Sequence, residues 1–380
     1  MSAARDSGGG PIGLAAGGTG GHLFPAQALA EELAARGFAT LLLSDERAGR
    51  FAEDFPGTAI HAIPAATLSL RRPWRLPGQL WTLLAGVRQS LALLRRSRPR
   101  VVVGFGGYPS APPMRAAAIL GIPTIVHEQG AALGRANRLA AKRAALIAAS
   151  FPDITGLPAD LAAKVVHTGN PVRRQVLALA GSAYEPPAPD GPFNLLVVGG
   201  SQGAHVFAEI IPAMLRALPD ETRRRVALVM QCRAEDMEAT RAALTGLEIA
   251  ATLRPFFDDM PQRMTAAHLV ICRAGASTIA ELAVIGRPAI LVPLPHALEN
   301  DQLHNARKVA EAGGGWLMEQ KNITPERLAG FVRRLMEAPE ELAVAAAAAR
   351  RLGKPDAAAR LADLAQRLAA GQRRSGSSTA

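Results

Sequence analysis

The sequence reads Leu14-Ala15-Ala16-Gly17-Gly18-Thr19-Gly20-Gly21-His22 near its start and Leu195-Leu196-Val197-Val198-Gly199-Gly200-Ser201-Gln202-Gly203-Ala204 near its middle. Each stretch is a short apolar run, a turn of the form Gly-Gly-hydroxyl-x-Gly, and a segment compatible with a helix. Such turns direct backbone N–H groups and a helix N-terminus at an anion. The two copies predict two similar nucleotide-type α/β domains. A site between two such domains suits an enzyme that joins two phosphate-bearing substrates.

Strand-like and helix-like segments alternate along both halves of the chain. The apolar runs lie at 12–16, 39–43, 101–104, 124–127 and 146–149 in the first half, and at 193–198, 226–231, 269–272 and 289–292 in the second. This alternation predicts two doubly wound parallel sheets. Several runs are apolar throughout, as expected of strands covered on both faces.

Composition also indicates where the domains begin and end. The stretch 184–192 is crowded with proline and glycine just before the second glycine-rich strand. We expect a flexible N-terminus at 1–10, a first domain at 11–169, a linker at 170–192, a second domain at 193–354, a C-terminal helix at 355–371 that packs back on the first domain, and a disordered tail at 372–380.

The 380 residues, 49% hydrophobic and 20% charged, are typical of a globular protein with two domains. No apolar run approaches the roughly 20 residues that span a bilayer, and the first ten residues lack a signal-peptide pattern. We therefore expect a protein that stays in the cytoplasm. Cys232 and Cys272 end apolar runs and are predicted core residues, and no Cys/His cluster has the spacing of a metal site.

The net charge of +11 is mostly arginine and suits nucleic acid, an anionic membrane surface or phosphorylated substrates. The segment Leu68–Arg100 combines arginines with Trp74, Trp81 and many leucines, a mixture typical of a membrane interface. The alternative is an amphipathic helix packed on its own domain. A nucleic-acid binder would explain the charge but not two phosphate turns, and two tyrosines and three tryptophans leave few stacking platforms.

Six motifs then follow one another in order: Gly17–Pro25, Gly106–Ser110, His127–Gln129, Gly169–Arg173, Gly199–Ala204, and Arg273–Thr278 with Glu281. In these motifs, and over residues 11 to 365, the chain resembles the MurG family of peptidoglycan glycosyltransferases. The resemblance implies a GT-B fold, with two Rossmann-like domains facing a cleft. It assigns the acceptor lipid I and the membrane to the first domain, and the donor UDP-N-acetylglucosamine to the second.

The same resemblance implies an inverting transfer of N-acetylglucosamine to the 4-hydroxyl of N-acetylmuramic acid in lipid I, which yields lipid II and UDP. It implies no cofactor and no essential active-site metal. The enzyme would lie peripherally on the anionic cytoplasmic face of the inner membrane, and its implied partners include cell-wall synthesis and division proteins but no nucleic acid.

An inverting transfer needs a base for the acceptor hydroxyl and groups that stabilise the leaving diphosphate. We predict that His22 is the general base, because it follows the first glycine turn and an unperturbed imidazole pKa near about 6.5 suits proton removal at neutral pH. Two alternatives stay open. His22 caps the helix or binds a phosphate, or Glu128, at a strand end beside His127, is the base.

The other site residues rest mainly on the resemblance. The donor-binding positions are Thr19, Gly20, Gly21, Gly130, Asn137, Arg173, Ser201, Gln202, Phe257, Arg273, Ala274, Gly275, Ala276, Glu281, Asp301 and Gln302, and the acceptor-side positions are Gly106, Gly107 and Tyr108. The turns supply N–H groups to phosphates, unless the first turn merely requires glycine. Gly130 stands where the family usually has Asn, so the contact made by that Asn side chain is absent or replaced. The pair Asp258 and Asp259 is predicted to cap a helix.

Two other enzyme classes fit parts of the pattern. A GT-B relative that isomerises or hydrolyses UDP-N-acetylglucosamine would lack the basic segment and the motif Gly106-Gly107-Tyr108. A nicotinamide dehydrogenase would need a third glycine where Leu23 stands, although Asp45 at a strand end resembles a ribose-binding acid.

Overall fold

The computed structural model describes residues 10–47, 49, 55, 57–67, 73–200, 203–295 and 300–376, with side chains as far as 371. Contacts divide the chain into two units, Met1–Arg173 with Asp356–Ala380, and Arg174–Pro355. The predicted N-terminal segment, apart from Gly10, and the last four residues of the predicted tail lie outside the described residues.

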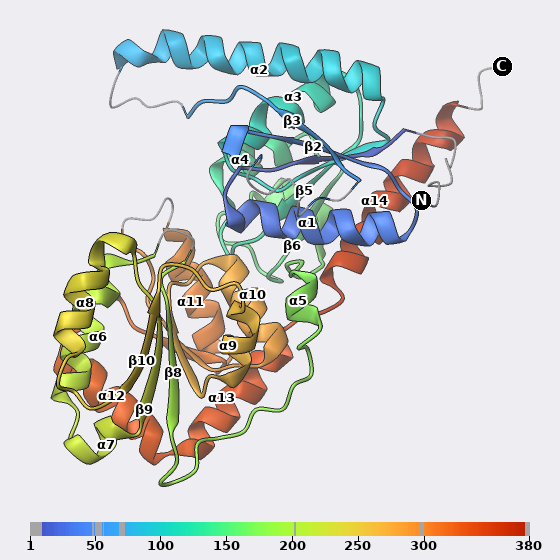
Figure 1. The fold of residues 1–380 in the computed structure, drawn as a ribbon. Coiled ribbons are helices and arrows are strands. Elements are labelled where there is room, and N and C mark those ends of the chain that lie inside the picture. Colours follow the sequence, from blue (N-terminus) through green and yellow to red (C-terminus); the bar gives the residue numbers. More distant parts are fainter. Residues whose placement is uncertain are drawn as a thin grey trace. The chain divides into compact units, whose positions relative to one another are not determined.

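The first unit is built on a parallel sheet with the order β3-β2-β1-β4-β5-β6-β7 (Figure 1). The strands are β1 Ile12–Ala15, β2 Thr40–Ser44, β3 Ala59–Ala62, β4 Val101–Gly104, β5 Thr124–Glu128, β6 Leu146–Ala149 and β7 Val165–His167. In register, Ile12 of β1 pairs with Thr40 on one side and Val101 on the other. The order of the strands therefore runs outward in opposite directions from β1 and from β4. The carboxyl ends of these two strands form the switch point where ligands bind in such sheets.

Helices cover both faces of this sheet. They are α1 Gly20–Ala35, α2 Leu76–Ser97, α3 Ala111–Ile119, α4 Arg135–Ala141 and α14 Ala357–Gly376. One apolar core joins the sheet to α1 and α14, and another joins its opposite face to α2 and α3 (Figure 1). The end of α1 is fastened to α14 by Arg36, which lies 2.6 Å from Asp363. Helix α14 reaches Gly376, so the helix is longer than the predicted 355–371.

The second unit repeats this plan with the sheet order β10-β9-β8-β11-β12-β13, again parallel. Its strands are β8 Phe193–Val198, β9 Val226–Gln231, β10 Ala250–Arg254, β11 Leu269–Cys272, β12 Ala289–Leu291 and β13 Gly315–Leu317. Its helices are α5 Arg174–Leu177, α6 His205–Ala217, α7 Asp220–Arg224, α8 Met237–Leu244, α9 Met260–Ala266, α10 Ala276–Ile285, α11 Asp301–Glu311, α12 Pro325–Glu337 and α13 Pro339–Leu352. The prediction of two doubly wound parallel sheets is confirmed.

Three details refine the sequence-based picture. The chain changes unit at Arg173–Arg174, so residues 174–192 of the predicted linker belong to the second unit. Strands β3, β7, β10 and β13 were not predicted, and all four lie at sheet edges. Cys232 and Cys272 are buried as predicted, and burial raises the pKa of Cys272 to about 12.

Candidate active site

Two glycine turns meet at the switch point of the first sheet. Gly106 and Gly107 follow β4 with φ of 81° and 73°, in the left-handed region that glycine adopts without strain. A Cβ on Gly107 would lie 3.1 Å from the Cα of Gly17 in the other turn and 3.4 Å from the His22 ring. The two turns are therefore packed backbone to backbone, with the imidazole of His22 against both.

His22 lies in the first turn of α1, where its Nδ1 is 3.0 Å from the Thr19 hydroxyl oxygen. His22 is half-buried, and burial lowers its pKa to about 4, with the positive charge of Arg47 lowering it further. At neutral pH the imidazole is thus uncharged and able to accept a proton. This corrects the assumption of an unperturbed value, because His22 is a weaker base in the free protein.

Glu128, the competing base, ends β5 and is buried. Its carboxylate accepts hydrogen bonds from the backbone N–H of Gly130 (3.0 Å) and Gly134 (3.0 Å), and from the Asn137 side-chain amide (2.9 Å). Asn137 also donates to the carbonyl of His127, at 3.1 Å. These contacts fold the loop between β5 and α4 around the carboxylate, which is the arrangement of a structural acid. One of these contacts is made by the backbone N–H of Gly130. An Asn at this position would supply the same N–H group.

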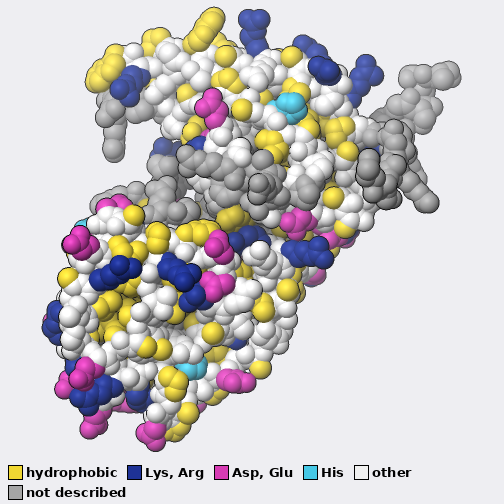
Figure 2. All heavy atoms as spheres, viewed as in Figure 1, with side chains coloured by type: hydrophobic (Ala, Val, Ile, Leu, Met, Phe, Trp, Pro, Cys, Tyr) yellow, Lys and Arg dark blue, Asp and Glu magenta, His cyan; other side chains and the backbone are white. Residues whose placement is uncertain are grey.

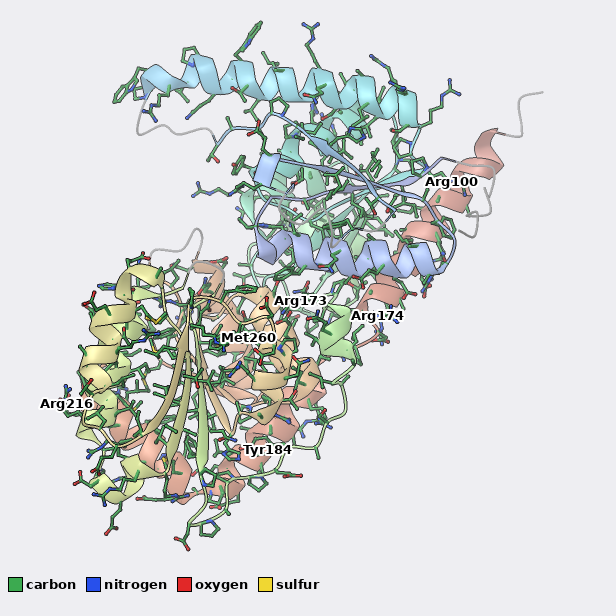
Figure 3. The ribbon with its side chains drawn as sticks, in the orientation of Figure 1. Arg100, Arg173, Arg174, Tyr184, Arg216 and Met260 are labelled. Carbon is green, nitrogen blue, oxygen red and sulfur yellow. The ribbon has the colours of Figure 1, made fainter. Side chains whose placement is uncertain are left out.

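Two neighbouring positions complete the first unit's site. His127 Nε2 lies 3.2 Å from the carbonyl oxygen of Gly169, and burial lowers the pKa of His127 to about 4. The guanidinium of Arg173, labelled in Figure 3, lies 4.5 Å from the ring centre of Phe24, in the first turns of α1. Arg173 therefore places a cation beside the first turns of α1.

In the second unit, the switch point lies at β8 and β11, and each strand is followed by a predicted phosphate turn. A Cβ on Gly199 would lie 2.3 Å from the backbone nitrogen of Ala204, so the first turn admits only glycine there. Ser201 and Gln202 fall outside the described residues. After β11, α10 begins at Ala276 with Gly275 as its N-cap and no side-chain capping bond. A helix N-terminus without a side-chain cap is a typical place for an anion to bind.

The Arg273 side chain is held by other residues of the second unit, so what it offers to the site is its positive charge. Its guanidinium donates to the carbonyls of Val292 (3.2 Å) and Pro293 (3.1 Å) and to the side-chain oxygen of Gln320 (2.8 Å). Burial lowers the pKa of Arg273. Sequence reasoning missed Asn305 of α11, whose amide donates to the Ala274 carbonyl at 3.0 Å and holds this turn. The sequence feature that could have indicated this role is an Asn on the apolar face of an amphipathic helix.

The other predicted donor residues are held by local contacts. Glu281 is buried on α10. The side chain of Gln302 accepts from the backbone N–H of Leu294 at 3.0 Å, and Asp301 accepts from the N–H of Gln302 at 2.8 Å. Asn300, just before them, has a left-handed backbone with φ of 52°.

The segment after β10 contains the predicted donor residue Phe257 and the predicted capping residue Asp259. Phe257 is 2% exposed and lies under Arg263, whose guanidinium is 4.3 Å from the ring centre, whereas the neighbouring Phe256 is 66% exposed. Asp259 occupies the N-cap position of α9, but its carboxylate pairs with Arg263 at 2.8 Å and makes no capping bond. The predicted capping role is therefore wrong for the Asp259 side chain, because an arginine one turn on competes for it.

Helix α2 and the single helical turn Pro73–Arg75 just before it, together called the α2 surface, present apolar and basic side chains. Trp74 is 73% exposed and Trp81 is 72% exposed, with the exposed Leu84 and Arg88 on the same side as Trp81, three and seven positions on. Hydrophobic and basic side chains lie next to each other along this edge of the first unit in Figure 2. No described helix is long and apolar enough to cross a membrane. Within the described part of the chain, no group of three or more His, Cys, Asp or Glu residues could hold a metal ion.

Comparison with known proteins gives consistent matches. The model of the glycosyltransferase family 28 N-terminal domain matches residues 12–149, and that of the C-terminal domain matches 194–364. The chain is 49% identical over 360 residues (94% of this chain, 96% of the other) to the UDP-N-acetylglucosamine–N-acetylmuramyl-(pentapeptide) pyrophosphoryl-undecaprenol N-acetylglucosamine transferase of Rhizobium etli strain CIAT 652. It is 50% identical over 364 residues (96% and 95%) to the protein of that name from Brucella abortus strain S19. The crystal structure of Acinetobacter baumannii MurG superposes with a TM-score of 0.75 at 31% identity, covering 94% of this chain and 99% of that one.

Proposed function

The chain belongs to glycosyltransferase family 28, and from this we propose that it transfers N-acetylglucosamine from UDP-N-acetylglucosamine to lipid I. The acceptor atom is the 4-hydroxyl oxygen of the N-acetylmuramoyl residue, and the products are lipid II and UDP. The observation that carries the proposal is the identity of about half the residues, over nearly the whole chain, to two N-acetylglucosamine transferases named for this acceptor. Both glycine-rich turns lie within the matched length.

The proposal gives each unit one substrate. The first unit takes the acceptor, and neutral His22 removes the proton of the attacking hydroxyl as the new glycosidic bond forms. The second unit takes the donor, whose bond from the anomeric carbon to the phosphate oxygen breaks with inversion. The departing UDP keeps the bonding electron pair and carries it as negative charge.

Fixed positive groups support the release of UDP. The N-terminus of α10 directs the positive end of its helix dipole at the donor phosphates, and the buried charge of Arg273 lies directly before it. The resemblance also assigns Arg173 and the N–H groups of Thr19, Gly20 and Gly21 to phosphate binding. Such preorganised donors are the usual means of stabilising developing negative charge.

We further propose that the protein binds the cytoplasmic face of the inner membrane through α2. Trp74 and Trp81 would enter the interface while the exposed Arg88, Arg95 and Arg96 meet anionic head groups. This arrangement suits an acceptor that is anchored in the bilayer by its lipid.

The transfer proposal is tested by incubating the purified protein with radiolabelled UDP-N-acetylglucosamine and a short-chain lipid I analogue in the presence of EDTA. We expect label in the lipid product and release of UDP. Hydrolysis or isomerisation of the donor without acceptor, and no labelled lipid, would instead favour a donor-modifying relative.

Gly21→Ala tests the close approach of a substrate to the first glycine turn. A Cβ on Gly21 would meet no heavy atom within 4 Å, so the folded protein accommodates it. We expect unchanged thermal stability and a loss of kcat/KM of about 10- to 100-fold, because the methyl group displaces a diphosphate from the backbone. Gly330→Ala on α12, whose Cβ also meets nothing, is the matched control. Equal activity of both variants would remove Gly21 from the site.

Replacing both tryptophans of the α2 surface by serine tests membrane binding. We expect Trp74→Ser/Trp81→Ser to weaken binding to vesicles containing anionic phospholipid by roughly tenfold or more, because two large apolar surfaces stay in water. Co-sedimentation with vesicles measures this. Leu139→Ser on α4, 75% exposed in the wild type, is the control and is expected to bind normally. Equal losses in both proteins would refute a specific role for α2.

A further inference from the structure

An arginine–aspartate pair follows β9 in the second unit and is not used in the proposed mechanism. Arg233 donates to the two carboxylate oxygens of Asp236, from Nε at 2.6 Å and from Nη2 at 3.0 Å. Asp236 is 8% exposed and occupies the N-cap position of α8, yet its side chain makes no capping bond. Its carboxylate also contacts Nδ1 of His205, the first residue of α6, at 2.8 Å. The pair therefore joins the end of β9 to the start of α6.

Arg233 also packs against the glycine turn that follows β8. Gly203 ends this turn with φ of 69°, and a Cβ there would lie 2.5 Å from Cγ of Arg233. The backbone of Gly203 and Ala204 in turn leaves no room for a Cβ on Gly199. A hydrogen bond from the N–H of Gly203 to the carbonyl of Gly200, at 3.0 Å, closes the turn. The limb of the turn that returns toward α6 is thus packed against Gly199 and against the stem of Arg233.

The segment that carries Arg233 is itself fixed. Cys232, just before it, donates its backbone N–H to the carbonyl of Arg254 in β10 at 3.0 Å. Thr240 of α8 is 1% exposed and donates its hydroxyl to the Asp236 carbonyl at 2.8 Å. Paired hydrogen bonds between a guanidinium and a carboxylate also fix the orientation of an arginine. The stem of Arg233 therefore has little freedom to move away from the glycine turn.

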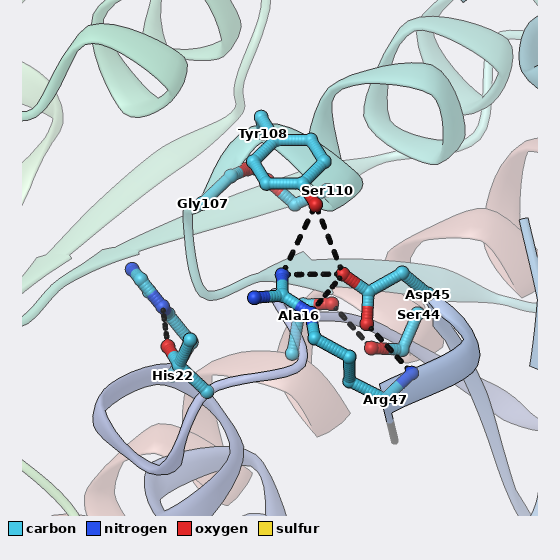
Figure 4. Close-up of polar contacts among 9 residues, drawn as sticks. Ala16, His22, Ser44, Asp45, Arg47, Gly107, Tyr108 and Ser110 are labelled. Carbon is cyan, nitrogen blue, oxygen red and sulfur yellow. Dashed lines mark hydrogen bonds and ion pairs between the residues drawn. The ribbon is translucent and has the colours of Figure 1, made fainter. Parts of the chain in front are cut away.

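The first unit repeats this arrangement beside its own glycine turn. Arg47, after β2, donates to the Asp45 carboxylate from Nε at 2.9 Å and from Nη2 at 2.5 Å, and to the Tyr108 hydroxyl oxygen at 3.2 Å (Figure 4). A Cβ on Gly18 would overlap the Asp45 carboxylate and lie 2.8 Å from the Cβ of Arg47. In both units, therefore, an arginine–aspartate pair that follows the neighbouring strand packs against the glycine turn of the central strand.

We propose that Arg233, held by Asp236, is a positioning residue that keeps the glycine turn after β8 in the shape that binds the donor diphosphate. The inference rests on the proposed function, in which the second unit binds UDP-N-acetylglucosamine. Arg233 touches no reacting atom in this role. It limits the motion of the returning limb, so the backbone of the turn is already placed when the donor arrives. Such preorganisation favours binding because less conformational freedom is lost.

Calorimetric titration of the full-length protein with UDP tests this role, together with the KM of each substrate in the transfer assay. We expect Arg233→Ala to raise the dissociation constant of UDP and the KM of UDP-N-acetylglucosamine by about tenfold or more, and to leave the KM of the lipid I analogue unchanged. Arg233→Lys keeps the stem and a positive charge for Asp236, so it should lose less. The control Arg224→Ala should bind UDP like the wild type, because it removes an exposed arginine of α7, beside the amino end of β8.

Asp236→Asn keeps the shape of the side chain and separates positioning from direct contact with the donor. Positioning predicts weaker UDP binding in this variant, since Arg233 loses the charged partner that holds it. A guanidinium that bound phosphate directly would bind it at least as well without the competing carboxylate. UDP binding at or above wild-type affinity in Asp236→Asn, or at wild-type affinity in Arg233→Ala, therefore overturns the inference. Weaker UDP binding in both variants, with no transfer to the lipid I analogue by the wild type, would overturn the proposed function and leave the role of Arg233 standing.

Discussion

His22→Ala is expected to lower the rate of transfer to the lipid I analogue by about 10²- to 10⁴-fold, the usual contribution of a general base. Folding should be unaffected, because His22 is only half-buried and its hydrogen-bond partner is the neighbouring Thr19. Since the pKa of His22 lies at about 4, wild-type kcat/KM should be nearly independent of pH near neutrality, where His22 is unprotonated, and should fall as the pH approaches that value. Radiolabel transfer between pH 4 and 8 measures both effects.

A histidine elsewhere in the first unit provides the control. His61 lies on the edge strand β3, and His61→Ala is expected to transfer at the wild-type rate. Transfer by His22→Ala at the wild-type rate would contradict the assignment and return Glu128 to consideration as the base. A large loss in both variants would point to damage of the sheet rather than to chemistry.

Glu128→Ala is expected to lower the free energy of unfolding by about 2–5 kcal/mol, because its buried donors lose their acceptor. Those donors are the N–H groups of Gly130 and Gly134 and the amide of Asn137. Transfer should fall as well, since the loop between β5 and α4 then loses its anchor. Thermal unfolding followed by circular dichroism, together with the transfer assay, separates the two effects.

Asp160→Ala removes an exposed carboxylate from the same unit and should leave the unfolding temperature within error of the wild type. The structural reading of Glu128 fails if Glu128→Ala unfolds at the wild-type temperature while transfer is lost. That result would identify Glu128 as a group that acts on the substrate. The pair of variants at 22 and 128 thus decides between the two bases that the sequence leaves open.

The central strands could be predicted from sequence because each contains a short, mostly apolar run. Strands β1, β4, β5 and β11 are buried along their whole length and β8 along nearly all of it, so most of their positions select an apolar residue. The edge strands escaped prediction for the opposite reason. Strand β3 reads Ala-Ile-His-Ala with no buried residue, and β10 reads Ala-Ala-Thr-Leu-Arg and is mostly exposed. A strand with one neighbour and one open side needs no apolar run.

By itself, therefore, the sequence determined the two parallel sheets, the glycine turns after their central strands and the family that uses them. These depend on local patterns: apolar runs, helix periodicity and glycines that no other residue replaces. Only the tertiary structure decided what the polar side chains do, because their partners lie far along the chain. Glu128 is occupied by a loop that ends at Asn137, Arg273 by Gln320, and Arg47 by Tyr108. The type of a residue tells whether its side chain can carry charge or donate a hydrogen bond. The burial of that side chain and its distance from other groups decide whether it stabilises the fold or stays available to a substrate.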